Sequence, residues 1–156
     1  MKKKGADYQF ITASENNAWL LNIRGRDIKY SPIPHCYVLI SKNKDIKIFC
    51  DLKKIPFSLK KFFSNIKFLR IESIDTVLSQ ISDKKFIIDM STCSFYFEEI
   101  ILQNNKILEF EDPIYNYKAI KTENEIKNIK KVHIYDGVAL TKYLFWVKKN
   151  FYKKKI

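Results

Sequence analysis

The sequence predicts an α/β fold in which helices flank a mixed β-sheet and one long helix follows at the C-terminal end. Short β-branched and aromatic runs alternate with segments whose apolar residues recur every three or four positions, as in layered α/β domains. A hydrophobic content of 46%, with 12 Phe and 9 Tyr, indicates a packed core. At 156 residues the chain suffices for one domain, and only 3 Gly and 4 Pro interrupt it, so long flexible linkers are not expected.

The first elements predicted are a strand, a short helix and a charged turn. Tyr8–Thr12 alternates around β-branched residues as a half-buried strand does, and Ser14 is the expected N-cap of a helix that runs to Leu21. Gly25 then permits a tight turn. The charged side chains presented by this turn are Arg24, Arg26 and Asp27.

A hairpin and a third strand are predicted next. Cys36–Ser41 and Ile46–Cys50 flank the polar segment Lys42–Asp45, so they are expected to be antiparallel strands joined by a four-residue loop. Ser58–Phe63 predicts a short helix, and Lys67–Ile71 predicts another strand.

The following segment predicts two helices and two strands. Ser73 is the expected cap of a helix whose apolar residues follow a spacing of three and four. Phe86–Asp89 predicts a compact strand, after which Ser91 and Thr92 are the expected caps of a helix that runs to about residue 104. Ile107–Phe110 predicts the last strand of the sheet.

Beyond Pro113 the pattern predicts one long amphipathic helix. Thr122 and Glu125 have the spacing of a capping box. The helix is expected to run about 30 residues, or roughly 45 Å. Its apolar face comprises Ile126, Ile129, His133, Leu140, Leu144, Val147 and Phe151. We therefore divide the chain into a first domain, 1–117, and a helical segment, 118–156.

Cysteine and histidine usage favours a cytoplasmic protein without a zinc site. Cys36, Cys50 and Cys93 are odd in number and lack Cys-x-x-Cys spacing, which fits reduced thiols. His35 and His133 are the only histidines, and neither has a paired ligand spacing around it. No apolar run reaches the roughly eighteen residues of a membrane span, and the Lys-rich start does not read as a signal peptide. A membrane partner is therefore not expected.

The net charge of +12 suggests a polyanionic partner, but its distribution argues against nucleic acid. Of the 29 basic residues only Arg24, Arg26 and Arg70 are arginines, and the lysines are spread along the whole chain. Nucleic-acid sites usually combine Arg with exposed aromatic residues on one face. We therefore do not expect nucleic acid to be the partner.

Two aspartates follow predicted strands and allow two interpretations. Asp51 and Asp89 could form a carboxylate pair that binds Mg²⁺, as in a nuclease or phosphotransferase. Alternatively, each carboxylate accepts hydrogen bonds from loop or helix N–H groups. We favour the second interpretation.

Four segments together resemble the cytosolic-type Xaa-Pro aminopeptidases. Ile11–Asp27 is similar to a signature of their creatinase/prolidase N-terminal-like domain, which reads Thr-Ala-x-x-Glu and then Ala-Trp-Leu-Leu-Asn-Ile-Arg-Gly-x-Asp. Ile48–Asp51 and Ile87–Phe97 are similar to two strand ends of that domain. Lys118–Leu140 resembles the first long helix of the pita-bread catalytic domain, so the resemblance covers most of the chain.

The resemblance implies a fragment of a metal-dependent aminopeptidase that releases an N-terminal residue preceding proline. It implies that Lys2–Asp7 begins where the first helix of the domain would be ending. The two Asp, one His and two Glu that hold two divalent ions, expected to be manganese, would follow this chain. His133 and Asp136 would then lie on a structural helix rather than among the metal ligands. The chain alone would hold no cofactor and would be inactive.

The resemblance also changes the interpretation of the charged turn. It implies that Arg24, Asp27 and Tyr30 contact substrate or a subunit interface, and this interpretation then weighs as much as the structural turn with solvated charges that the residues alone favour. Arg26 departs from the small residue common in the family. The expected partners are the remaining catalytic domain or a homodimer partner, with a peptide as substrate of the intact enzyme.

A second hypothesis is a stand-alone binding or regulatory module that kept this fold without catalysis. Such a module would contact acidic partners or nucleic acid through its lysines. It should also cover its apolar surfaces, whereas the predicted last helix carries an apolar face with no predicted neighbour.

Overall fold

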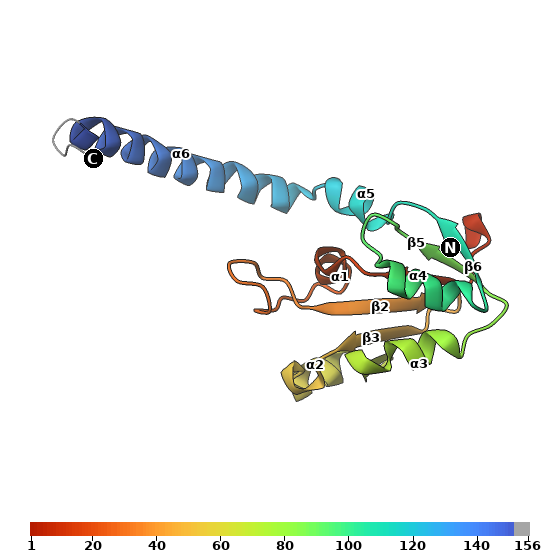
Figure 1. Cartoon of the computed structure of the whole chain (residues 1–156). Helices are drawn as coiled ribbons and strands as arrows, with labels where there is room; N and C mark the ends of the chain where they lie inside the picture. The colour runs from red at the N-terminus through yellow and green to blue at the C-terminus, as the bar shows by residue number, and fades with distance from the viewer. Residues whose placement is uncertain (152–156) are drawn as a thin grey trace. The chain divides into compact units, whose positions relative to one another are not determined.

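The computed structural model describes residues 1–151, which divide into two compact units, Met1–Tyr117 and a second that begins at Lys118. The first unit is built on a six-stranded mixed sheet with strand order β4-β3-β2-β1-β5-β6 (Figure 1). Its strands are β1 (Tyr8–Ile11), β2 (Cys36–Ser41), β3 (Ile46–Cys50), β4 (Ile66–Arg70), β5 (Lys85–Ile88) and β6 (Lys106–Glu109). The predicted α/β class with a mixed sheet and a long helix is confirmed.

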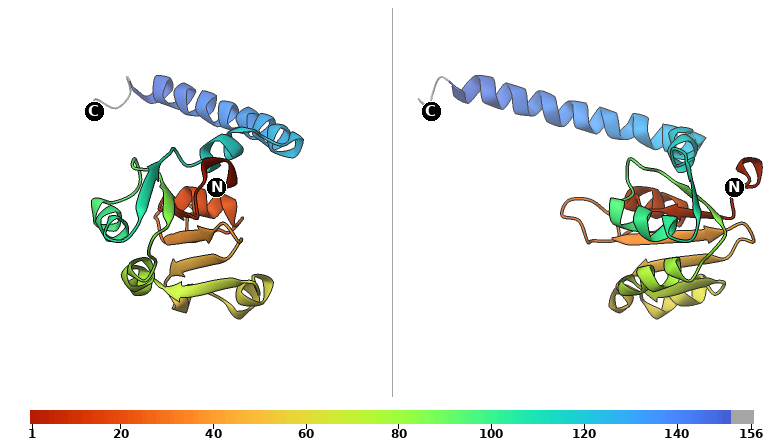
Figure 2. Two further views of the ribbon diagram at one scale, coloured as in Figure 1. Left: turned by 90° about the vertical axis from the view of Figure 1, so that its right-hand side faces the viewer. Right: turned by 45° about the vertical axis from the view of Figure 1, so that its right-hand side comes forward.

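Short helices cover both faces of this sheet. They are α1 (Ser14–Leu20), α2 (Phe57–Phe62), α3 (Ile74–Ser79), α4 (Phe95–Leu102) and α5 (Ile114–Ala119), with 3-10 turns η1 (Lys2–Lys4), η2 (Leu52–Lys54) and η3 (Ile71–Ser73). The left view of Figure 2 shows α3 and α4 on one side of the strands, with α1 and α2 on the other.

Alternation along the strands fills a hydrophobic cluster on each face. On the α3/α4 face, Phe10, Leu39 and Phe49 pack with Leu78 and Ile101. The opposite cluster is built from Ile11, Leu21, Cys36, Val38, Ile48, Cys50 and Ile114. The strands β1, β2 and β3 thus contribute alternate residues to the two cores, as the period of two requires.

Strand pairing confirms the predicted hairpin and makes β1 the junction of the sheet. β2 and β3 are antiparallel, with Cys36 opposite Cys50. β1 pairs antiparallel with β2 and parallel with β5, while β3–β4 and β5–β6 are parallel. The carboxyl ends of β1 and β5 therefore meet at one edge, where the Thr12 and Thr92 hydroxyl oxygens lie 2.9 Å apart. The site residues gather around this edge.

The expected helix caps are wrong at α1 and α4, and at α3 the expected N-cap residue is correct but makes no capping hydrogen bond. Helix α1 begins at Ser14 itself, and its N-cap is Ala13. Ser73 does occupy the N-cap position of α3, but its hydroxyl donates backward to the Arg70 carbonyl at 2.6 Å. Ser91 and Thr92 belong to a turn around Asp89. Helix α4 therefore begins only after Ser94.

The second unit is the helix α6 (Glu123–Phe151), of 29 residues. Its capping box is confirmed. The Thr122 N–H donates to Glu125 Oε2 at 2.8 Å, and the Glu125 N–H donates to Thr122 Oγ1 at 3.3 Å. None of its residues is buried, and its apolar side chains are exposed. Among the described residues, no helix has both the length and the apolarity to cross a membrane.

Candidate functional site

The loop between α1 and β2, residues 21–35, carries the three predicted site residues. It leaves α1 through Asn22, whose φ of 50° reverses the chain in the left-handed region. The Arg24 guanidinium folds back on the helix, and its Nη1 donates to the Ala18 carbonyl at 3.2 Å and to its own neighbour Ile23 at 2.8 Å. Arg24 thus caps the end of α1, while its side chain remains exposed at the mouth of a hollow.

Gly25 is required here by close approach rather than by a left-handed backbone. Its φ is not positive, and a Cβ built on it would lie 2.6 Å from Pro34 Cα. The outgoing and returning segments of the loop therefore come into contact at Gly25 and Pro34. The Gly25 N–H also donates to the Pro32 carbonyl at 3.3 Å. This contact fixes where Arg24 and Arg26 leave the backbone.

Asp27 ties the loop to the segment after β3. Its Oδ1 lies 2.5 Å from Lys54 Nζ, and its Oδ2 accepts the His35 N–H at 2.8 Å. The hydrogen bond from Lys54, and then that from His35, hold the pKa of the Asp27 carboxyl below its ordinary value. Asp27 is thus satisfied by this chain's own groups.

Loss of the lysine should be visible in the titration of Asp27. In Lys54→Met we expect the Asp27 pKa to rise toward its ordinary value of 3.8. A carboxyl with a lowered pKa contributes stability above its unfolded pKa, about 3.9, and that stability is lost as pH falls through the folded pKa. As the pH falls below about 4, the free energy of unfolding should therefore decrease less in the variant than in the wild type. NMR titration of the carboxyl carbon, with urea unfolding across the same pH range, makes the measurement.

Lys53→Met is the matched control for that titration, because Lys53 is exposed and Asp27 makes its side-chain pair with Lys54. An Asp27 pKa that is equal in both variants would contradict the pairing.

Tyr30 lies at the tip of the loop. It has a φ of 64°, and its side chain is 92% exposed. Lys29 Nζ stands 5.0 Å from the centre of its ring. Arg24 and Asp27 line one hollow, whereas Tyr30 lines a second depression, which Arg24 also borders.

The hollow beside the loop, here called the Gly25 hollow, has a volume of about 820 Å³. It lies between residues 22–27 and residues 50–59, with Pro34 and His35 completing the wall. Arg24, Arg26 and Lys54 supply positive charge, and Asp27 and Asp51 supply negative charge. Cys50, Ile55 and Leu59 give it an apolar floor. The Gly25 hollow thus presents both signs of charge around an apolar floor.

A buried polar network stands behind the loop at the carboxyl ends of β1, β5 and β6. Asp112 is its centre and is 4% exposed. Its Oδ1 accepts Gln9 Nε2 and the Ile114 N–H, both at 3.1 Å, and its Oδ2 accepts Asn16 Nδ2 at 2.7 Å. The Asp112 N–H in turn donates to Asp89 Oδ2 at 2.9 Å. The network joins β1, α1, β5 and the segment that enters α5.

Asn17 links the two strands between which α1 and the loop lie, β1 and β2. It is fully buried, and its Nδ2 donates to the Ile11 carbonyl at 3.2 Å and to the Cys36 carbonyl at 2.8 Å. One side chain thus holds the end of β1 to the start of β2. Asn16 and Asn17 were not predicted as site residues, and the sequence signal was their polarity at positions where α1 faces the core.

Asp51 and Asp89 follow the second of the two interpretations. Asp51 Oδ1 accepts the Lys53 N–H at 3.0 Å and so caps η2. Asp89 Oδ1 accepts the Ser91 N–H at 3.0 Å and its hydroxyl at 2.5 Å. Burial opposes ionisation of Asp89, but these bonds and that from Asp112 outweigh it and lower its pKa. Across residues 1–151 no three His, Cys, Asp or Glu side chains are grouped so that they could hold a metal ion.

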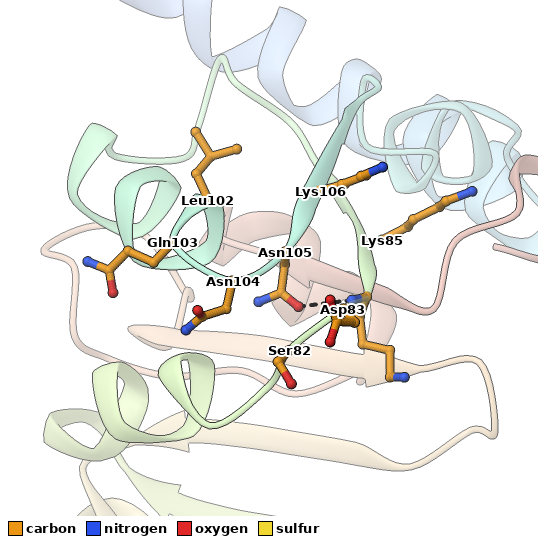
Figure 3. A pocket seen from close by; sticks show the side chains of 9 residues that line it. Ser82, Asp83, Lys85, Leu102, Gln103, Asn104, Asn105 and Lys106 are labelled. Carbon is orange, nitrogen blue, oxygen red and sulfur yellow. Dashed lines mark hydrogen bonds between the residues drawn. The ribbon is translucent and has the colours of Figure 1, made fainter.

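A second hollow, of about 600 Å³, opens between the ends of α3, α4 and the starts of β5 and β6 (Figure 3). Asn105 closes its base, with Oδ1 accepting the Lys84 N–H at 3.1 Å and Nδ2 donating to the Ile81 carbonyl at 2.7 Å. Lys85 and Lys106 are opposite each other in the β5–β6 register. The Asn105 amide serves the turn between the strands, and no histidine or cysteine lines this hollow.

The fold and the site agree with one protein family. The creatinase/prolidase N-terminal domain matches residues 1–125. The chain belongs to this family. It is 34% identical over 157 residues to Xaa-Pro aminopeptidase 1 of Dictyostelium discoideum, covering 99% of this chain and 25% of that protein. Against the Xaa-Pro aminopeptidase ApepP of Drosophila melanogaster the identity is 32%, covering 94% and 25%. This creatinase/prolidase N-terminal domain chain therefore spans about a quarter of those relatives.

Solved structures support the same fold. The X-prolyl aminopeptidase of Caenorhabditis elegans, described as a cytosolic enzyme with a di-nuclear active site, superposes with a TM-score of 0.82 at 24% identity. That match covers 99% of this creatinase/prolidase-type chain and 26% of the enzyme. The prolidase of Pyrococcus furiosus superposes with a TM-score of 0.56 at 18% identity, covering 81% and 35%. At these identities the likeness establishes the fold alone.

Proposed function

We propose that this chain is a non-catalytic part of a metal-dependent Xaa-Pro aminopeptidase, an enzyme that releases an N-terminal residue preceding proline. The observation that carries the proposal is the match of nearly the whole chain to about a quarter of two Xaa-Pro aminopeptidases at more than 30% identity. The C. elegans relative is called cytosolic, and we propose the same compartment here.

The metal ions of the reaction do not belong to the described residues. No group of ligands there fits them, so no hydrolytic step is assigned to these side chains. We propose that the two divalent ions, manganese by expectation, are held by the catalytic domain with which this domain works. The partner of this chain is then that catalytic domain or a second copy of the enzyme.

The contribution of this domain, in this proposal, is to shape the approach of the peptide or a subunit contact. The loop with Arg24, Asp27 and Tyr30 is the candidate surface. Arg24 supports this role because its Nη1 makes the hydrogen bonds to the Ala18 and Ile23 carbonyls, which leaves the rest of its planar fork to meet a carboxylate. Asp27 holds the loop in place through its ion pair with Lys54, and in this proposal it positions Arg24.

The purified chain is expected to release no N-terminal residue from Xaa-Pro peptides, even with excess Mn²⁺ or Co²⁺. The reason is the missing ligand set, because carboxylate and imidazole ligands must converge to hold two ions. Amino acid release is measured beside a protein-free control and an active Xaa-Pro aminopeptidase. Turnover that persists through repurification would overturn the proposal that this chain is non-catalytic.

Arg24→Ala at the matching position of an intact Xaa-Pro aminopeptidase is expected to lower turnover or subunit assembly. The lost hydrogen bonds to the helix end should cost only about 1 kcal/mol of stability. The matched control is the change to Ala at the position that matches Lys53, since Lys53 is exposed and does not line the Gly25 hollow. Measurements of kcat/KM, oligomeric state and Tm separate the roles. Equal activity and assembly in both variants would leave Arg24 a structural cap only.

A further inference from the structure

Two cysteines face each other at the open end of the β2–β3 hairpin. Cys36 begins β2, Cys50 ends β3, and the register places them directly opposite. They are 2% and 6% exposed and belong to the same hydrophobic cluster. Both are free thiols.

The hairpin hydrogen bonds define the kind of pair that these cysteines form. The Ser41 N–H donates to the Asp45 carbonyl at 2.9 Å, so Ser41 and Asp45 form a hydrogen-bonded pair. Such pairs alternate along an antiparallel ladder. Five steps further along the register, Cys36 and Cys50 form a non-hydrogen-bonded pair, in which Cα atoms are about 4.5 Å apart and side chains are closest. That separation lies at the short end of the disulfide range.

We propose that Cys36 and Cys50 are a modification site, a dithiol that a peroxide converts into a cross-strand disulfide. Cys50 is the entry point because it lines the Gly25 hollow, whereas Cys36 does not. The pair lies within one hairpin, so its alignment depends only on residues 36–50 and not on any partner.

The oxidation proceeds in two steps that balance. The Cys50 thiolate attacks the peroxide, the O–O bond breaks, and one oxygen leaves as hydroxide, which takes up the proton released by the thiol and becomes water. Cys50 is then a sulfenic acid. The Cys36 sulfur attacks Cys50 Sγ, the S–O bond breaks, and a second water leaves. Two thiols and one peroxide thus give one disulfide and two waters.

Burial controls the rate of this reaction. It raises the pKa of Cys50 to about 11 and that of Cys36 to about 12, with the neighbouring thiol adding to the effect at Cys36. Because the thiolate is the nucleophile, only a small fraction reacts at neutral pH. The site is therefore inert to brief exposure and responds to sustained oxidant.

The new bond would act on the candidate site, because both cysteines are attached to it. The Cys36 carbonyl accepts Asn17 Nδ2, and the residue before Cys36 donates its N–H to Asp27. The residue after Cys50 caps η2, which carries Lys54. The bond would tie the two strand ends to each other, and with them the two walls of the Gly25 hollow.

The test is treatment of the folded, reduced chain with hydrogen peroxide, followed by non-reducing peptide mapping. We expect a peptide pair linked through Cys36 and Cys50, formed about ten times faster for each pH unit between pH 7 and pH 9. The Cys93→Ala variant should form the same link. Circular dichroism before and after treatment verifies that the chain is folded.

Two variants identify the order of attack. Cys36→Ala should stop the reaction at a Cys50 sulfenic acid that a dimedone probe captures. Cys50→Ala should slow reaction at Cys36 at least tenfold, because its sulfur does not line the hollow. A link that forms only in urea, disulfides only between chains, or a Cys50 that over-oxidises in the wild type without the link would each overturn the proposal.

Discussion

Asp112→Ala is expected to destabilise the first unit by roughly 3–5 kcal/mol, the largest effect of any single change proposed here. The carboxylate accepts Gln9 Nε2, Asn16 Nδ2 and the Ile114 N–H in a site that is 4% exposed. Alanine removes both of these acceptor oxygens and leaves their buried donors without this partner. Urea unfolding, followed by far-UV circular dichroism, measures the loss.

Glu111→Ala is the matched control, since Glu111 is the exposed neighbour in the same segment. It should change stability by less than about 0.5 kcal/mol. If Asp112→Ala does not fold, Asp112→Asn keeps the shape but presents an N–H₂ group to one of the donors, and an intermediate loss is expected. Equal stability of the Asp112 and Glu111 variants would contradict the network.

Gly25→Ala is expected to cost about 1–3 kcal/mol and to displace the loop. The added Cβ would meet Pro34 Cα at 2.6 Å, and the atom in the way belongs to a backbone that cannot rotate aside. Arg24 and Asp27 should move with the loop, so the Asp27–Lys54 pair should weaken too. Thermal unfolding and the Asp27 titration report the two effects.

Gly137→Ala makes the same chemical change where nothing lies within 4 Å of the new atom. Because Gly137 lies inside α6, we expect a gain of up to about 1 kcal/mol of helix stability there, seen as higher helix content by circular dichroism. Two glycines that respond alike would show that the contact with Pro34 is not close in solution.

The strands and helices could be predicted from the sequence because each is a local pattern of apolar spacing. The hairpin Cys36–Cys50 is one case, since alternation, polar turn and strand length all agree. The caps were harder to predict, because a serine hydroxyl has several acceptors within reach. The Ser73 hydroxyl donates to the Arg70 carbonyl and the Ser91 hydroxyl donates to Asp89, so neither hydroxyl makes a capping hydrogen bond to the helix that follows it.

The candidate site could be predicted only in part. The position of Arg24 and Asp27 on one loop was a local inference. The partner of Asp27, Lys54, lies 27 residues away. Gln9 and Asp112 are 103 residues apart, and the sequence around each of them does not indicate that the other is its partner. Such contacts exist only after the sheet has placed β1 beside β5, so the polarity of Asn16 on the core-facing side of α1 could mark a buried polar residue but not its partner.

The place of β1 in the strand order has a consequence for how the chain folds. β2, β3 and β4 are successive in sequence and can associate soon after they are made, as can β5 and β6. β1 alone among the described strands bonds to both groups, and the Lys85 N–H reaches Asp7 Oδ2 across 78 residues. The chain between Asp7 and Lys85 must therefore be closed into a loop, at a cost in entropy, before β5 and β6 can bury their apolar side chains. We therefore expect the half-sheet of β1 to β4 to assemble first during synthesis, and the docking of β5 on β1 to set the folding rate.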